Sequence, residues 1–302
     1  MSAAAHDPIE FDPTAPLTAS GNLRRRQLVN GLAEGGATAS ALLAVGILGI
    51  LVGSVIARGG KAISIDFLTK NPPQFGGPGG GIASAIVGTM LLSLLATAIA
   101  MPLGILVAVY LTEYAGPRSA RVIRLALDLL NGLPSIIVGL FVFGLLVAGH
   151  KQSGFAGSFA LAIIMLPLIA RATQEMLLLV PGHLREAADA LGVARWRTVV
   201  GIIIPAALGG IVTGTVLAFA RAAGETAPLI FTTSIFANNI QLNPFGHALP
   251  NIPVTIFVLS QQADPSGFER AWGAALVLLV FILVMNIVAR AMLARSRSKM
   301  AR

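Results

Sequence analysis

Six long apolar segments divide this chain, with polar or glycine-rich stretches between them. A helix needs about 20 predominantly apolar residues to cross the hydrocarbon core of a bilayer, and every one of the six segments reaches that length. The predicted spans are residues 35–57, 82–110, 127–149, 156–180, 200–235 and 270–290. The fifth is long enough to be bent. The pattern therefore predicts an all-α integral membrane protein with six transmembrane helices.

The composition agrees with this assignment. Of the 302 residues, 55% are apolar and only 11% are charged, whereas a soluble globular domain carries about 25% charged residues. The chain has no cysteine, which excludes disulfides and cysteine-based metal or redox sites. His183 and His247 stand alone in the sequence, so we expect no metal site.

Basic residues alternate between the predicted loops, and this alternation gives an orientation. Cytoplasmic loops of membrane proteins carry an excess of lysine and arginine. With the N-terminus inside, the cytoplasmic segments hold Arg24, Arg25, Arg26, Arg118, Arg121, Arg124, Arg171, Arg185, Arg195, Arg197, Arg290, Arg295, Arg297, Lys299 and Arg302, and the outer segments hold only Arg58, Lys61, Lys70, Lys151 and Arg270. Both termini are therefore predicted to be cytoplasmic. The net charge of +8 is then mostly a topological bias facing lipid headgroups, and no nucleic-acid partner is expected.

The remaining segments complete the expected organisation. Residues 1–34 lack the basic, apolar and cleavage-site order of a signal peptide, so they are predicted to be an uncleaved cytoplasmic tail, partly disordered. Residues 58–81 form an outer loop, residues 82–290 the core with five spans, and residues 291–302 a basic cytoplasmic tail. Gly60–Lys61 is not part of a phosphate-binding loop of the G-x-x-x-x-G-K-[ST] type. Val55 stands where this motif requires Gly, and Ala62 stands where it requires Ser or Thr.

The cytoplasmic loop 181–205 reads "PGHLREAADALGVARWRTVVGIIIP". Leu184, Ala187, Ala188 and Leu191 follow the i, i+3, i+4, i+7 spacing of one helical face, and Arg185 and Asp189 lie at pairing distance on the other side. Gly192 is expected to end this helix. The pattern leaves two alternatives open: a helix that merely connects two spans, or one that docks into a groove on a partner.

The residues of this loop also carry a longer motif. Glu186-Ala187-Ala188, three residues, Gly192, nine residues, and then Ile202-x-Ile204-Pro205 resemble the EAA loop of ABC importer permeases, with Ile204 where the family usually has Leu. The resemblance implies an ABC type I importer permease fold. It also implies that Glu186, Ala187, Ala188 and Gly192 couple the chain to a separate ATPase. ATP and Mg would be used by that ATPase, and this chain would bind no cofactor.

Further segments are similar to the phosphate-specific (Pst) importers. They are "GGIASAIVGTMLLSLLATAIAMPLGILVAVYLTEYA", "LLNGLPSIIVGLFVFG", "IIMLPLIARATQEMLLLVP" and "ARAAGETAPLIFT", and the "GETAPL" run resembles the PstA-type subunit. The resemblance implies a bacterial inner-membrane phosphate permease that works with a PstC-type permease, two PstB-type ATPases and a PstS-type binding protein. Alternatives are an importer of another oxyanion (sulfate, molybdate or phosphonate) and an ion-coupled secondary transporter, which would not need an EAA loop.

Charged residues inside the apolar spans are candidates for the anion path or gate. A charge at mid-membrane costs about 2.5–3.5 kcal/mol on insertion scales, so such residues usually face a cavity or a partner. Arg221 and Glu225 are four residues apart and could line the path or simply pair with each other; Arg171 could bind the anion, snorkel to headgroups, or pair with Glu175. A guanidinium suits an oxyanion because it stays charged and presents a planar fork of donors.

Overall fold

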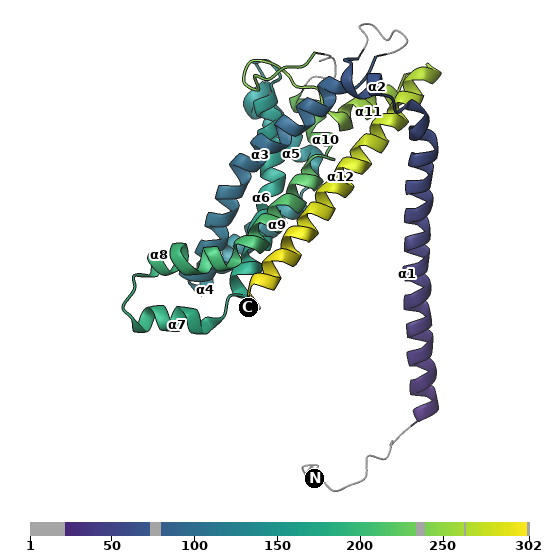
Figure 1. Cartoon of the computed structure of the whole chain (residues 1–302). Coiled ribbons are helices and arrows are strands. Elements are labelled where there is room, and N and C mark those ends of the chain that lie inside the picture. The colour runs from purple at the N-terminus through teal and green to yellow at the C-terminus, as the bar shows by residue number, and fades with distance from the viewer. Residues whose placement is uncertain (1–21, 73–79, 234–238, 263, 301–302) are drawn as a thin grey trace, which may run out of the picture. The chain divides into compact units, whose positions relative to one another are not determined.

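The computed structural model of the chain describes residues 22–72, 80–233, 239–262 and 264–300, and helices are the regular elements of these residues. Of residues 293–300 only the backbone is described. The chain forms two compact units, residues 1–53 and 54–302 (Figure 1). Among the described residues, five helices are long and apolar enough to cross a membrane, or six if one bent pair counts as a span.

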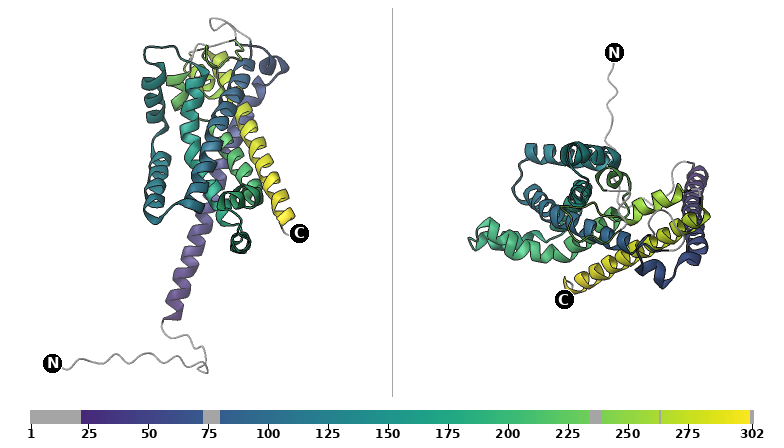
Figure 2. Two further views of the ribbon diagram at one scale, coloured as in Figure 1. Left: turned by 90° about the vertical axis from the view of Figure 1, so that its left-hand side faces the viewer. Right: turned by 90° about the horizontal axis from the view of Figure 1, so that it is seen from above.

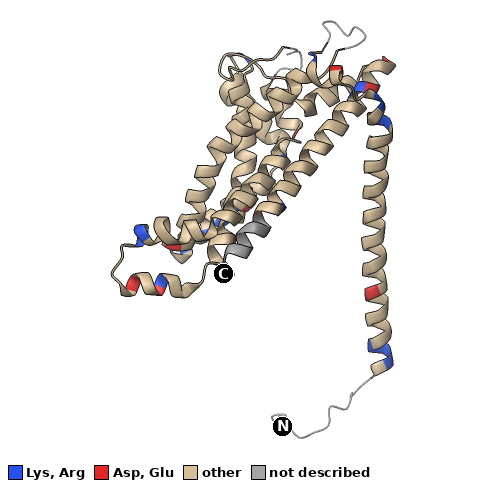
Figure 3. Cartoon of the chain, in the orientation of Figure 1, with Lys and Arg blue, Asp and Glu red and all other residues tan. Residues whose placement is uncertain are grey.

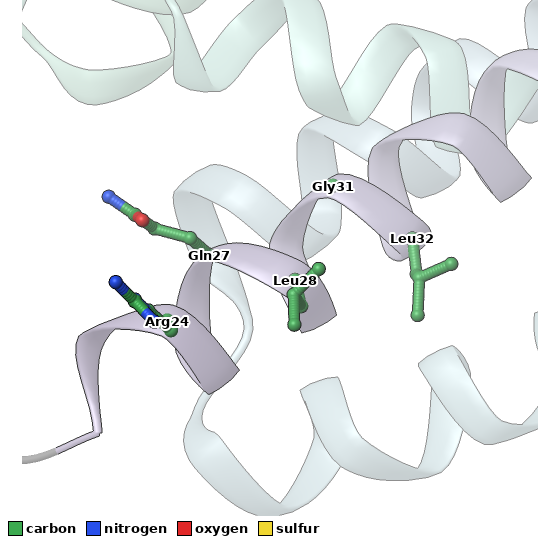
Figure 4. Close-up of a pocket in the computed structure, with 5 residues that line it drawn as sticks. All are labelled: Arg24, Gln27, Leu28, Gly31 and Leu32. Atoms are coloured by element: carbon green, nitrogen blue, oxygen red, sulfur yellow. The ribbon is translucent and has the colours of Figure 1, made fainter.

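The first unit consists of most of helix α1, Leu23–Gly59. The helix begins well before the predicted start of the span at residue 35, so residues 23–34 are helical rather than part of a tail; residues 1–21 lie outside the described part. Figure 4 shows a hollow on this helix lined by Arg24, Gln27, Leu28, Gly31 and Leu32. All five residues come from one helix. The hollow is therefore a shallow depression in the surface of a single helix.

The second unit is built around α3, Ala83–Val109, and α6, Gly154–Leu178, which pack along much of their length. Small residues allow this approach: Ala96 and Ala100 are fully buried, and a Cβ on Gly104 would lie 2.9 Å from Ile169 Cγ2. In lipid, helices associate through such close packing, since no hydrophobic effect drives them together. Leu92, Leu161, Met165 and Phe219 belong to the apolar cluster at this contact.

Helix α9, Ile204–Ala222, packs on α6 through its G-x-x-x-G pair. A Cβ on Gly210 would lie 2.1 Å from Met176 Sδ, and one on Gly214 would lie 2.5 Å from Ala172 Cβ. These glycines thus permit the close contact between the two helices. Helix α12, Pro265–Met300, packs against α9 and the short α11, Ile252–Ser260 (Figure 2).

The two ends of α12 lie in different surroundings. Its first turns meet the last turn of α1, where Arg58 lies over the Trp272 ring at 4.9 Å. Before it, Asp264 accepts hydrogen bonds from the Ser266 hydroxyl and backbone N–H, which lower the pKa of the Asp264 carboxyl below its usual value. At the other end the helix continues to Met300, so residues 291–300, predicted as a tail, are helical.

The third predicted span, residues 127–149, is broken. Helix α4, Pro117–Gly132, meets α5, Ser135–Val142, which continues as the π-helical turn η4, Phe143–Val147, and the two parts are bent by 97°. Pro134 explains the break, because a proline lacks the N–H for a helical hydrogen bond and disfavours helical backbone at the residue before it.

The fifth predicted span, residues 200–235, ends earlier than expected. The helical run passes from α8, Arg195–Thr198, through the π-helical turn η5, Val199–Ile203, into α9 and ends at Ala222. A separate short helix α10, Ala227–Thr232, follows. Gly224 and Pro228 lie in the intervening turn and at the start of α10, where they favour an interruption. Residues 234–238 lie outside the described part.

The segment that leads into α11 is held in place by buried hydrogen bonds, one of which reaches α3. The Ile252 N–H donates to Thr89 Oγ1 at 2.8 Å, and Asn251 Nδ2 donates to Thr233 Oγ1 at 3.1 Å. The chain approaches α3 so closely that a Cβ on Gly88 would lie 1.9 Å from the Pro250 carbonyl oxygen. The segment is therefore fixed against α3 by both polar contacts and lack of space.

Gly88→Ala should lower the stability of the protein, because the new methyl group would overlap a backbone oxygen that cannot rotate away. Overpacking of this kind costs roughly 1–3 kcal/mol. Thermal unfolding of the detergent-solubilised protein measures the effect. Gly144→Ala is the control, since a Cβ at Gly144 meets nothing within 4 Å. Equal melting temperatures for the two variants would contradict the close contact.

Candidate functional site

The loop with the motif residues forms a helical hairpin at one end of the second unit (Figure 1). Its first arm is α7, Gly182–Ala190, and its second arm is α8. Figure 3 shows that the charged residues of the second unit gather mostly at this end and at the opposite end near α2, Ile65–Thr69, while the body of the bundle is mostly uncharged. This distribution is the one expected of a bundle that crosses a bilayer.

Gly192 ends the first arm, as the sequence predicts. Its φ is +68°, a left-handed conformation in which glycine has no steric penalty. The Gly192 N–H donates to the Asp189 carbonyl at 3.0 Å and the Val193 N–H to the Ala188 carbonyl at 3.0 Å, so the last carbonyls of α7 are satisfied. The glycine therefore turns the chain sharply from α7 towards α8.

The EAA residues face different directions. Ala188 is buried, with 3% exposure, whereas Glu186 and Ala187 are exposed. Leu191 and Trp196 are also exposed, at 82% and 59%, although the apolar spacing had placed Leu191 on the same helical face as Ala188. The hairpin thus presents a glutamate and large apolar side chains outward, a combination that suits docking to another protein. The coupling role of Glu186, Ala187, Ala188 and Gly192 stays a prediction.

Arg185 lies elsewhere than the sequence suggested. Instead of pairing with Asp189, its Nη2 donates to Glu113 Oε1 at 2.9 Å and its Nε donates to the same oxygen at 3.2 Å. Nη1 donates to the Val180 carbonyl at 2.9 Å, and Nη2 also reaches the Leu177 carbonyl at 3.0 Å. The Glu113 side chain is only 4% exposed. Glu113 lies in the π-helical turn η3, Tyr110–Tyr114, which ends the run of α3.

The second arm contacts the same turn. The Arg195 guanidinium lies over the Tyr114 ring at 5.5 Å, a distance typical of a cation–π contact. The neighbouring residues Glu113 and Tyr114 of η3 thus each contact one arginine. Glu113 contacts Arg185, which precedes Gly192, and Tyr114 contacts Arg195, which follows it. Reading the sequence missed Glu113 and Tyr114; the available signal was an isolated glutamate at the end of an apolar span, in "YLTEYA".

Arg171, a candidate for the anion path, pairs with Asp128 of α4 and not with Glu175. The side chains are 37% and 62% exposed. The contact connects α6 to α4, the half of the broken third span that the sequence places near the cytoplasm. Because both side chains are still accessible, Arg171 keeps part of its guanidinium open to an anion.

Arg221 and Glu225 do form a pair, but a long one. Arg221 Nε lies 3.9 Å from Glu225 Oε1, and the side chains are 59% and 20% exposed. The two residues do not share one helix, because α9 ends at Ala222 and Glu225 lies in the turn before α10. This geometry leaves most of the Arg221 guanidinium unoccupied by the carboxylate. Arg171 and Arg221 therefore have different carboxylate partners, and their roles in an anion path stay predictions.

The fold and the loop can be compared with known proteins. The model of the family described as binding-protein-dependent transport system inner membrane component matches residues 100–302. The chain belongs to this family. The matched region contains α7, Gly192 and all three candidate path residues.

Relatives narrow the type of permease. The phosphate transport system permease protein PstA 1 of Mycobacterium tuberculosis is 39% identical over 285 residues, which cover 92% of this chain and 92% of the relative. The PstA of Yersinia pestis is 42% identical over 247 residues, covering 81% of this chain and 83% of the relative. The permease is therefore of the PstA type.

Solved structures support the fold. A bacterial alginate ABC transporter, solved with an alginate-bound periplasmic protein, contains a chain that matches with a TM-score of 0.56 at 17% identity, covering 90% of this permease and 96% of that chain. The MetNI methionine ABC transporter matches with a TM-score of 0.54 at 16% identity, covering 72% and 94%. The permease thus has the ABC type I importer fold, and it is a multi-pass transport subunit of the bacterial inner membrane.

Gly192→Ala should loosen the end of α7, because a left-handed backbone costs a residue with a Cβ about 1–2 kcal/mol. We expect faster hydrogen–deuterium exchange in residues 186–193, while Gly192→Asn should have a smaller effect because asparagine tolerates this conformation. Gly182→Ala is the matched control: it lies at the other end of α7, also with open space around a new Cβ but without a positive φ. Exchange unchanged in Gly192→Ala would contradict the turn.

Proposed function

We propose that this permease is a transmembrane subunit of an ATP-driven importer of inorganic phosphate. The observation that carries the proposal is the 39% identity to a phosphate transport permease over more than nine-tenths of both chains. Phosphate carries one or two negative charges near neutral pH and cannot cross the hydrocarbon core unaided. Arginine side chains in the apolar spans supply the compensating charge that such an ion needs.

The energy source is a separate ATPase on which the α7–α8 hairpin docks. The outward Glu186 and the exposed Leu191 and Trp196 support this assignment, since docking surfaces combine apolar anchors with a few charges. The chain itself carries no nucleotide-binding motif and no cofactor; ATP and Mg are used by two copies of a PstB-type ATPase. A PstC-type permease completes the path, and a PstS-type protein delivers phosphate.

Both termini lie in the cytoplasm in this proposal. The hairpin must face the cytoplasm, where ATP is, and the C-terminal end of α12 lies at the same end of the second unit as the hairpin (Figure 1). The last turn of α1 contacts the first turns of α12, which belong to the opposite end. For helix α1, the positive-inside rule assigns the N-terminal end to the cytoplasmic side. The arginines at its start, Arg24–Arg26, agree with that side.

Reconstitution tests the substrate. Vesicles that contain this permease with its PstC-, PstB- and PstS-type partners should take up radiolabelled phosphate only with ATP, and a tenfold excess of sulfate should leave uptake unchanged. Competition by sulfate, molybdate or phosphonate would transfer the assignment to that oxyanion. Uptake without an ATPase would instead identify a secondary transporter and contradict the proposal.

Arg221→Gln should lower phosphate uptake by at least about tenfold, since a lost hydrogen bond to a charged group is worth roughly 1.5–3 kcal/mol. Arg221→Lys should keep part of the activity. Arg290→Gln, which changes an exposed arginine near the end of α12, is the control and should transport normally.

Glu225→Gln tests the carboxylate of the same pair. We propose that Glu225 holds Arg221 partly neutralised and releases it during the transport cycle, so the amide should change both uptake and the coupled ATPase rate. The two rates are measured in the same vesicles at equal complex content. Uptake equal to that of the wild type would remove Glu225 from the gate.

A further inference from the structure

The ion pair between Glu113 and Arg185 is largely removed from water and lies apart from the candidate residues of the anion path. Glu113 is 4% exposed and Arg185 is 28% exposed, whereas the other pairs have at least one largely accessible side chain. An ion pair removed from water is sensitive to the loss of one partner, since the remaining charge is then buried without compensation. The buried carboxylate of Glu113 therefore holds the Arg185 side chain in one position.

Arg185 connects the η3 turn, which is distant in the sequence, with the end of α6 and the linker that precedes α7. Its guanidinium contacts Glu113 in η3, the Leu177 carbonyl in the last turn of α6, and the Val180 carbonyl in the linker to α7. The last carbonyls of a helix have no partner within the helix, and a cation there also interacts favourably with the helix dipole. One side chain thus closes the end of α6 and attaches α7 to α3.

Few apolar contacts attach α7 to the bundle. They come from Ala188, which is buried but small, and from Leu184, which is partly buried and packs against the cluster that includes Leu177 and Val180. The connections of α7 to α6 and to α8 are short turns at Pro181 and Gly192, around which a helix can tilt. The polar contacts of Arg185 therefore fix the direction of α7. The contact of Arg195 with Tyr114 fixes the second arm on the same η3 turn.

We propose that Glu113 and Arg185 are positioning residues for energy coupling: they make α7 part of one rigid body with α3 and α6. A movement imposed on α7 by the ATPase is then passed to the two central helices of the bundle. Without the pair, the same movement would tilt α7 about its flanking turns and be lost. This inference rests on the proposed function, in which α7 receives the ATPase stroke.

The first test separates coupling from folding. Arg185→Gln and Glu113→Gln complexes are reconstituted, and phosphate taken up per ATP hydrolysed is measured at equal complex content. We expect this ratio to fall by about tenfold, which lies within the usual range of coupling between linked sites. Arg185→Lys retains a cation and should restore part of the ratio, and Arg290→Gln should leave it unchanged.

A purely structural role gives a different result. Misfolding or poor assembly would lower uptake and ATP hydrolysis in proportion, because fewer complexes would be active and each would remain coupled. An unchanged ratio in Arg185→Gln, with both rates reduced, would therefore overturn the proposal. So would a lysine variant as uncoupled as the glutamine variant.

A second test needs no transported substrate. The chain has no cysteine, so spin labels can be placed specifically at His183→Cys on α7 and Leu106→Cys on α3, both exposed positions. In the nucleotide-free complex, Arg185→Gln should broaden the distance distribution between the labels relative to the wild-type pair. Identical distributions would overturn the proposal. If the wild-type complex imported no phosphate, the proposed function would fail while this measurement still decided the role of the pair.

Discussion

The close contact between α3 and α6 is the constraint on which the rest of this structure depends. Within a bilayer, apolar side chains gain nothing by leaving lipid for a neighbouring helix, so small residues such as Ala96, Ala100 and Gly104 bring the backbones together instead. Helix α9 uses the same device against α6, with Gly210 and Gly214. The broken third span and the α7–α8 hairpin pack on this framework through apolar side chains such as Leu127, Val142 and Leu184, and two ion pairs add to these contacts: Asp128 with Arg171, and Glu113 with Arg185.

Attachment through few buried contacts has a mechanical meaning. The framework helices interlock over many turns and resist relative movement, while α7 and α4 touch them with few buried side chains. In the proposed cycle, the Glu113–Arg185 pair holds α7 rigidly against these helices, while the Asp128–Arg171 pair connects α4 to α6. Some of the charged side chains in this apolar chain therefore serve to connect helices to one another. Arg221 differs, because its contact with Glu225 is long and leaves most of its guanidinium unoccupied.

The sequence predicted the helical class, the positions of most spans and the turn at Gly192, since each depends on local patterns of apolar residues or on one special residue. It also carried enough of the EAA motif to predict the family. It could not predict the pairing of Arg185 with Glu113, because the two are 72 residues apart and a nearer partner, Asp189, satisfied the helical spacing. The preference of Arg171 for Asp128 over Glu175 was hidden for the same reason. The break in the third span and the early end of the fifth show that prolines and glycines override a continuous apolar run.

The break at Pro134 also changes the thickness of the barrier. At about 1.5 Å per residue, the helical stretch 135–147 reaches about 20 Å, whereas the hydrocarbon core is about 30 Å thick. The rest of the crossing must therefore be formed by α4, which is bent by 97° from the following part of the span. This helix carries Arg121, Arg124 and Asp128. In the proposed orientation, water and charge would reach further into the protein on that side than a straight span would allow. An anion that left the permease there would regain its hydration shell before crossing the full width of the membrane.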